Sequence, residues 1–409
     1  MEMELTALHW IYVVFIALII GFMVKRRDTT LICIIGIFLL ALVATGSLAS
    51  SISGIFNSFI FAITELMSTI LIISIIVAMS TVLTKSGIND VMIAPFAKFI
   101  KNPTLAFWVI GIVMMIISWF FWPSPAVALL GAVMLPVALR AGLPALGVAM
   151  AMNLFGHGIA LSGDFIIQAA PKLTGDAASI PVGDVIAASI PLVITMGVVT
   201  TLSAFILLKR DMKLGRIKAA DNEGIVQDQT ISEDLLTLAQ KKFFAIFIPI
   251  AFLLDVVALS ILKLQGGDAT ALVGGTAVFI LLILSLVAHK QQGLEKSTAY
   301  LIQGFQFGFK VFGPVIPIAA FFYLGDSGFN QIIGDYLPKT SLGIVNDLGA
   351  ALAASVPLTK EIAAVTLTGI GAITGLDGSG FSGISLAGSV AKLFGTAIGG
   401  GTATLTALG

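Results

Sequence analysis

Long apolar segments alternate with short polar ones along most of this chain. The apolar runs are continuous over about 16 to 25 residues and do not alternate with a period of two, so they predict helices rather than strands. The pattern predicts spans at residues 9–24, 30–48, 57–85, 104–121, 125–140, 144–162, 184–208, 243–263, 269–288, 300–324, 345–375 (interrupted) and 381–398. The chain is therefore expected to consist of many long apolar helices.

Composition identifies that solvent as lipid. Hydrophobic residues make up 58% of the chain and charged residues 11%, and the mean hydropathy is +1.07. So few charged side chains cannot cover the surface of a water-soluble domain of this size. Only helices or closed barrels satisfy the backbone in lipid, and the continuous runs exclude a barrel. We expect an all-α polytopic membrane protein, and the zero net charge gives no indication of nucleic-acid binding.

The longest polar segment divides the chain in two. It covers residues 209–242 and mixes basic with acidic side chains. Further basic residues, Lys25, Arg26 and Arg27, follow the first span. Basic residues favour the cytoplasmic side, so the sequence predicts a first transmembrane repeat at 1–208, a cytoplasmic connecting loop at 209–242 and a second repeat at 243–409.

Two pairs of segments support the repeat. "TKSGINDVMI" at 84–93 resembles "GDSGFNQIIG" at 325–334, an offset of 241 residues. Ser124 lies between two prolines and Ser379 between two glycines, an offset of 255 residues. A match this short also occurs by chance, but it agrees with the span count and the charges. Together they predict two repeats of inverted topology, a layout that is frequent in secondary transporters.

The segments around these two serines predict broken helices. Proline and glycine free backbone groups, which are tolerated at membrane depth only inside protein or beside a wet cavity. Helix N-termini at such breaks suit an anion. The alternative is that small residues only let helices pack closely. With the 255-residue offset, Gly409 corresponds to Leu154, whereas the first repeat continues to Lys209, so we expect the chain to lack about 55 residues (209 minus 154).

These features resemble the ion transporter superfamily, which includes gluconate, C4-dicarboxylate and citrate permeases and the large membrane subunit of TRAP transporters. The resemblance lies in the repeats, the breaks at Ser124 and Ser379, and Gly142-Leu143-Pro144 after a small-residue span. The segment 171–199 looks like the family's proline-bounded loop leading into the closing span of a repeat. The resemblance implies re-entrant hairpins, a substrate site between their tips, and a homodimer that works by an elevator mechanism.

Polar residues at the breaks and inside the spans are the candidate site residues. For the substrate we predict Ser124, Asn153, Ser379, Ser382 and Lys310, and for the coupling ion His157, Asp164, Asp377 and Thr402. Hydroxyls and free carbonyls suit Na⁺, and histidine titrates near neutral pH and can carry a proton. Each has a structural alternative: His157 as a hydrogen-bonded core residue, Asp164 at an interface and Asp377 in an exposed loop.

Ionisable residues inside spans are costly and by default functional. The candidates in the most apolar surroundings are Glu65, Asp255 and Lys310. Lys310 is expected either to attract a carboxylate or to pair with one of the two acidic residues. Asp255 is expected near a membrane surface.

The function predicted is secondary active transport in a bacterial inner membrane. No enzyme signature, metal cluster or phosphate loop is present in the sequence. We expect uptake of a small organic anion, such as a hydroxy acid or dicarboxylate, with Na⁺ or H⁺ as coupling ion and no further cofactor. The alternatives are a cation/proton antiporter and a membrane subunit served by a separate binding protein.

Overall fold

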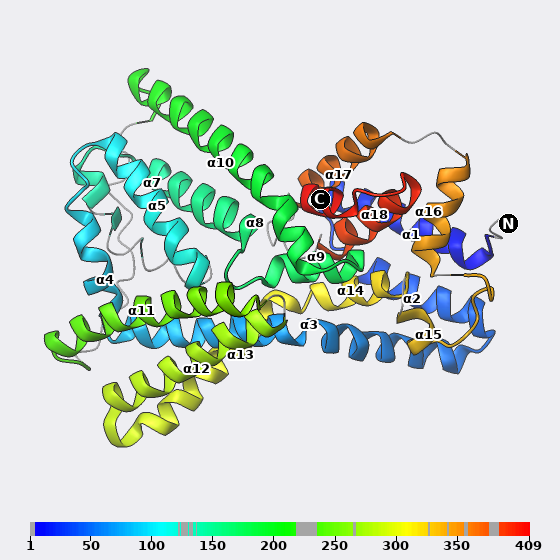
Figure 1. Cartoon of the computed structure of the whole chain (residues 1–409), viewed down its shortest axis with the longest axis horizontal. Helices are drawn as coiled ribbons and strands as arrows, with labels where there is room; N and C mark the ends of the chain where they lie inside the picture. The colour runs from blue at the N-terminus through cyan, green and yellow to red at the C-terminus, as the bar shows by residue number, and fades with distance from the viewer. Residues whose placement is uncertain are drawn as a thin grey trace. The chain divides into compact units, whose positions relative to one another are not determined.

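The computed structural model describes residues 5–121, 123, 130, 134–135, 137–217, 235–264, 267–325, 328–341, 343–355, 359–375 and 384–409. Every regular element in these residues is a helix (Figure 1). The first half contains α1 (Ala7–Val24), α2 (Thr30–Thr45), α3 (Leu48–Lys85), α4 (Ile88–Ala97), α5 (Pro103–Phe121), α7 (Ala145–Met152), the π-helix η1 (Asn153–Ala160), α8 (Leu161–Gly163), α9 (Ala169–Ala178) and α10 (Val182–Lys213). The predicted helical fold is thus confirmed.

The second half begins with α11 (Leu238–Leu262), α12 (Gly267–His289), the 3₁₀ turn η3 (Lys290–Gln292) and α13 (Gly293–Phe312). Shorter helices follow: α14 (Val315–Tyr323), α15 (Gly328–Ile332), α16 (Ile344–Ser355), α17 (Lys360–Gly375), α18 (Ile384–Ala397) and α19 (Thr402–Leu408). Within the described residues, seven helical segments are long and apolar enough to cross a membrane. They are α1, α3, α5, α7 to α8, α10, α11 and α12 to α13.

The helices recur in the same order in the two halves. The first half runs α1, α2, α3, then Gly87 and the short α4; the second runs α11, α12, α13 with α14, then Gly328 and the short α15. The two glycines are 241 residues apart (328 minus 87). One difference is that α3 is continuous over 38 residues, whereas its counterpart is interrupted at Gly313 and Pro314. The opposite orientation of the halves and the elevator architecture stay predictions.

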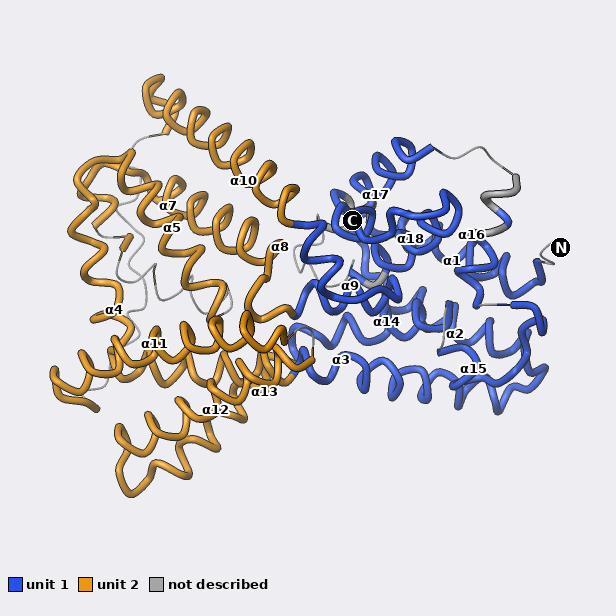
Figure 2. Tube along the Cα trace, viewed as in Figure 1, with its two compact units in different colours: residues 1–70, 169–189, 309–409 blue, residues 71–168, 190–308 orange. Residues whose placement is uncertain are grey.

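The compact units of the structure cut across the predicted repeats. Unit 1 contains residues 1–70, 169–189 and 309–409, and unit 2 contains residues 71–168 and 190–308 (Figure 2). Each unit therefore takes helices from both halves of the sequence. Helix α3 begins in unit 1 and ends in unit 2, whereas α13 begins in unit 2 and ends in unit 1.

Short helices dominate unit 1. Helix α18 packs on α9 and on α16. Gly388 allows the close approach of α18, because a Cβ atom there would lie 2.6 Å from the Ala177 Cβ and 2.7 Å from the Thr174 carbonyl oxygen. Aromatic residues join α1 to α14: Tyr12 stacks on Phe321 with ring centroids 5.0 Å apart. The result is a unit built around helices too short to span a bilayer by themselves.

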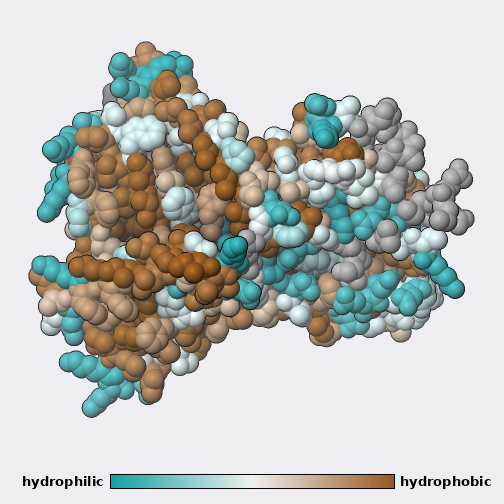
Figure 3. All heavy atoms as spheres, viewed as in Figure 1, coloured by the Kyte–Doolittle hydropathy of each residue, from teal (hydrophilic) through white to brown (hydrophobic). Residues whose placement is uncertain are grey.

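Longer helices dominate unit 2. Helix α5 packs on α7 and η1, and α11 packs on α4 and α12. The opposite side of α11 exposes large apolar side chains, which Figure 3 shows as a hydrophobic surface. They are Ile246, Ile250, Leu253, Leu254, Val257 and Ile261. Exposed aliphatic residues along a whole helix are the expected contact with lipid tails.

One prediction on secondary structure is wrong. The resemblance predicted a loop ahead of the span at 184–208, but α9 forms inside that segment. Proline is tolerated in the first turn of a helix, so Pro171 does not prevent it. A Schellman cap ends α9: the Ile180 amide donates to the Gly175 carbonyl at 3.0 Å, and the Ser179 amide donates to the Asp176 carbonyl at 3.1 Å.

Candidate functional site

Unit 1 contains a polar cavity of about 460 Å³. Its lining comes from α3, the end of α9 and the turn after it, α14, α15 and α18. The polar residues in the lining are Glu65, Asp176, Ser179, Tyr323, Gln331 and Ser389. This volume is in the range of sites that bind small solutes, so the cavity is the candidate functional site.

Glu65 is the most costly of these residues to place in a membrane. It lies near the middle of α3, one turn after Phe61, which lines the same cavity. Its carboxylate makes no ion pair and no hydrogen bond with the described residues. An ionisable side chain inside a span without a partner marks a pathway or a binding site.

The end of α9 contributes the second carboxylate. Asp176 pairs with Lys172 one turn earlier on the same helix. Ser179 takes the left-handed conformation at the cap, with φ of 56°, where glycine is usual. Its hydroxyl accepts a hydrogen bond from Lys392 Nζ of α18 at 2.9 Å. Both polar groups at this corner therefore have a lysine beside them.

Two hydroxyls in the cavity lining hydrogen-bond to no described residue. They belong to Tyr323 and Ser389, which are 8% and 5% exposed. The Tyr323 ring packs against Phe61 with centroids 5.7 Å apart. Both hydroxyls can therefore bond to a solute or to water inside the cavity.

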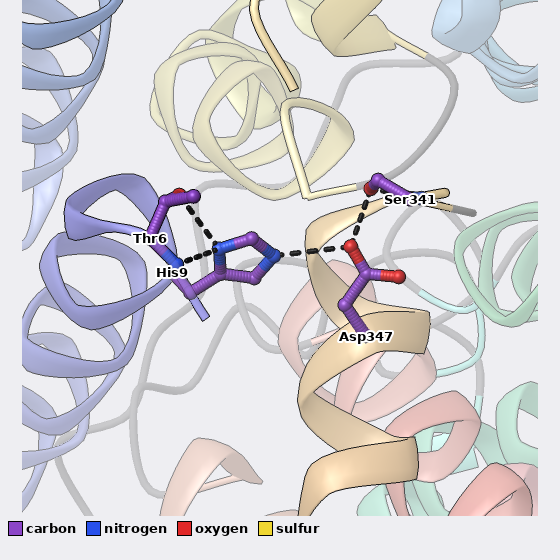
Figure 4. A network of polar contacts seen from close by, with 5 residues as sticks. Thr6, His9, Ser341 and Asp347 are labelled. Atoms are coloured by element: carbon purple, nitrogen blue, oxygen red, sulfur yellow. Dashed lines mark hydrogen bonds and ion pairs between the residues drawn. The ribbon is translucent and has the colours of Figure 1, made fainter. Parts of the chain in front are cut away.

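A second polar group in unit 1 is saturated with hydrogen bonds. His9, at the start of α1, is fully buried and lies 338 residues from Asp347 in α16. The His9 Nε2 atom is 3.1 Å from Asp347 Oδ2, and the Ser341 hydroxyl donates to the same oxygen (Figure 4). Thr6 contacts the other ring nitrogen of His9.

The hydrogen bonds of His9 join two helices. The Thr6 backbone amide donates to Nδ1 at 3.1 Å, so the hydrogen shared with the Asp347 carboxylate is donated by Nε2. This network fastens the first turn of α1 to the first turn of α16.

The π-helix η1 of unit 2 carries two of the predicted residues. Asn153 begins it and is exposed. His157 lies in its second half, and its Nδ1 atom is buried without a hydrogen-bond partner among the residues that the structure describes. Asp164, which ends α8 with φ of 34°, is 3% exposed. Short π-helices occur often at functional sites.

The other predicted residues are scattered. In unit 1, Lys310 is exposed in the last turn of α13, and Thr402 begins α19. Lys310 forms no ion pair with Glu65 among the described residues. Ser124, Asp377, Ser379 and Ser382 lie outside the described residues. The described candidates thus fall in different units, and which of them bind a ligand stays a prediction.

Asp255 is buried between helices. It is 6% exposed and hydrogen-bonds to Thr276 of α12, and its expected position near a membrane surface stays a prediction. Sequence reasoning missed Asp176, Tyr323 and Ser389, because their shared cavity exists only in the fold. For Glu65 the signal was present in the sequence: a lone acidic residue inside an apolar run.

Comparison with known proteins gives a relative but no further fold assignment. The chain is 58% identical over its 409 residues to the "Uncharacterized membrane protein YhfA" of Bacillus subtilis (strain 168). The match covers 100% of the chain and 88% of that protein. No model of a protein family and no solved structure matches the chain.

Proposed function

We propose that this chain, which belongs to the family of the membrane protein YhfA, is a secondary active transporter of a small organic anion, coupled to Na⁺ or H⁺. The observation that carries the proposal is the unpartnered carboxylate of Glu65, inside a span and beside a polar cavity. A residue in that position is expensive to keep unless it binds something.

The charges around the cavity support joint binding of an anion and a cation. Glu65 and Asp176 line the cavity. Lys172 pairs with Asp176, and Lys392 hydrogen-bonds to Ser179. An organic carboxylate placed beside Glu65 is repelled unless a cation or proton neutralises the acidic residue. Binding of the two ligands is then mutually favourable, which is the thermodynamic basis of coupling.

The hydroxyls of Tyr323 and Ser389 can orient a solute bound in the cavity. Each can donate a hydrogen bond to a carboxylate oxygen of the solute. The Gln331 side chain adds one more donor and acceptor. A hydroxy acid or dicarboxylate matches this mixture of donors and acceptors. The homodimer, the elevator motion and a location in a bacterial inner membrane belong to the same proposal.

The second candidate function is cation/proton antiport. It is favoured by the two carboxylates in the cavity lining, Glu65 and Asp176. In this case no organic anion enters, and the cation and the proton compete for the carboxylates. The two candidates differ in whether a carboxylate solute binds.

Thermal stability of the purified protein in detergent tests the proposal. Succinate, citrate and gluconate are each added in Na⁺ or in K⁺ buffer, at neutral and at mildly acidic pH. A ligand present at about 100 times its dissociation constant adds about 2.7 kcal/mol of stability. We expect one carboxylate to raise the melting temperature, more strongly with Na⁺ or at acidic pH.

Two matched variants locate the effect. Glu65→Gln removes the charge from the cavity and is expected to abolish the ion dependence of the stabilisation. Glu295→Gln removes an exposed glutamate at the start of α13 and should leave it unchanged. Stabilisation by cations alone, lost in Glu65→Gln, supports antiport instead. A ligand response that is the same in both variants overturns the assignment of the cavity.

A further inference from the structure

Asp255 in unit 2 is a buried carboxyl with only half of its hydrogen bonds satisfied. It lies on α11 and is 6% exposed. The Thr276 hydroxyl of α12 donates to Oδ1 at 2.9 Å. The second oxygen, Oδ2, is buried and has no hydrogen-bond partner among the described residues. This oxygen is the unexplained polar atom of unit 2.

No charged group among the described residues of the neighbouring helices is close enough to balance a negative charge there. Lys241 and Lys242 lie at the first turn of α11, about 20 Å along the helix from Asp255. Asp90 of α4 is near Lys241 and therefore at that same distant end. Asp268 and His289 lie at the two ends of α12, about 12 Å and 20 Å from Thr276. Helix α5, which contacts α11 through Phe120 and Phe252, has no ionisable residue.

The contacts distinguish a proton from a metal ion as the species bound. A hard cation needs several oxygen ligands. The described surroundings offer the carboxyl group and the Thr276 hydroxyl, whose hydrogen already points to Oδ1. An ionised carboxyl without a charged partner is very unfavourable in such a place, whereas the neutral acid is tolerated. The Thr276 hydrogen bond is compatible with both forms.

We propose that Asp255 is a second proton-binding residue of this protein, in addition to Glu65, and that the coupling ion is H⁺. The proposal rests on the proposed function and adds a proton site outside the solute cavity of unit 1. In the resting state Oδ2 carries the proton as a neutral acid. When α11 and α12 open the site to water, the O–H bond breaks, the proton leaves as hydronium and the carboxylate remains. Return of a proton from the other side restores the acid.

Infrared spectroscopy tests the protonated state directly. The full chain is reconstituted in lipid at neutral pH, and the carbonyl stretch of protonated carboxylic acids is recorded. We expect a band that is lost in Asp255→Asn, which has nearly the same shape as the neutral acid. Asp268→Asn, an exposed residue of α12, is the matched control and should keep the band. Thr276→Val removes the hydrogen bond to Oδ1 and should shift it. A spectrum identical in wild type and Asp255→Asn overturns the proposal.

Proton flux tests the coupling role. Proteoliposomes with a trapped pH-sensitive dye receive succinate, citrate or gluconate, without Na⁺. Flux in the wild type and in Asp268→Asn, but not in Asp255→Asn, supports the proposal. Equal flux in Asp255→Asn, or solute uptake that requires Na⁺ and moves no proton, overturns it and leaves the transport function standing. If the panel produces neither flux nor uptake in the wild type, the organic-anion function fails, and the infrared band alone decides whether Asp255 holds a proton.

Discussion

Two aspartates, one in each unit, are almost equally buried and differ in their partners. Asp347 of unit 1 is 1% exposed and accepts hydrogen bonds from His9 and Ser341. Asp255 of unit 2 is 6% exposed and has one hydrogen bond, from Thr276. Burial makes a carboxyl expensive in both cases, but the first accepts hydrogen bonds from two residues and the second from one described residue.

The difference separates a structural acid from one that can bind a proton. The contacts of Asp347 join α1 to α16, so its carboxylate stabilises unit 1. Asp255 joins α11 to α12 through one neutral hydroxyl, which leaves an oxygen free to gain or lose a proton. The number of hydrogen-bond partners, and not burial, therefore distinguishes the two roles. Substitutions of the partners and of the aspartates test this distinction.

The largest effect is expected at Asp347. Asp347→Ala leaves the His9 Nε2–H and the Ser341 hydroxyl buried without their acceptor. A buried donor left without its acceptor typically costs about 1 to 3 kcal/mol, and two donors are affected here. Denaturant-induced unfolding in detergent measures this loss. Asp335→Ala, at an exposed position before α16, is the control and should change stability by less than about 0.5 kcal/mol. Equal effects of the two substitutions contradict a stabilising role for the network.

A smaller effect is expected at a glycine contact in unit 1. Gly388→Ala places a Cβ atom against the Thr174 carbonyl oxygen and the Ala177 Cβ, which are rigid. Such overpacking costs about 1 to 3 kcal/mol. Gly156→Ala in unit 2 is the matched substitution, where the nearest atom, 2.5 Å away, is the end of the flexible Met114 side chain. We expect its loss of stability to be the smaller of the two in the same unfolding assay. The reverse order contradicts the close packing of α18 on α9.

Removal of a satisfied hydroxyl comes next. Ser341→Ala deletes the donor to Asp347 and the acceptor for the Gly343 amide, 3.1 Å away. Each hydrogen bond contributes about 1 kcal/mol, so the expected loss of stability is about 1 to 2 kcal/mol. Ser341→Thr, which keeps the hydroxyl, should recover most of it. No difference between the alanine and threonine variants means that the hydroxyl contributes nothing.

The smallest change is expected for an unsatisfied hydroxyl of unit 2. The Ser118 Oγ atom on α5 is buried and has no hydrogen-bond partner in the part of the chain that the structure describes. Ser118→Ala removes a group that was desolvated without compensation, so stability should stay within about 0.5 kcal/mol or rise. The contrast with Ser341→Ala is measured in the same unfolding experiment. A clear loss of stability in Ser118→Ala shows that this hydroxyl has a partner when the protein is in solution.

The long helices of this fold were predictable, and its polar sites mostly were not. Apolar runs predict α1, α5 and α11 closely, because spanning lipid requires a continuous run. Helix α9 was missed because its proline and glycine read as a loop, and tertiary contacts with α18 stabilise it.

Polar pairs over long sequence distances have no local signal. His9 gives no such signal, because its acceptor is 338 residues away. Nothing close to Asp255 in sequence shows that Thr276 covers it. Glu65 was singled out as a functional candidate from its apolar neighbours alone. The cavity beside it depends on five separate segments and could be recognised only in the fold.

The exchange of helices between the two units has a consequence for biogenesis. Unit 1 needs residues 309–409 as well as residues 1–70, so it cannot close until most of the chain has been synthesised. At about 5 to 20 residues per second, ribosomes need roughly 20 to 70 s to add the 338 residues that separate His9 from Asp347. During that time α1 lies in the membrane or in the insertion machinery, and His9 lacks its acceptor Asp347. Unit 1 therefore assembles late, after the second half of the sequence has been synthesised. Until then, α1 has to be kept in place without its contacts to α16.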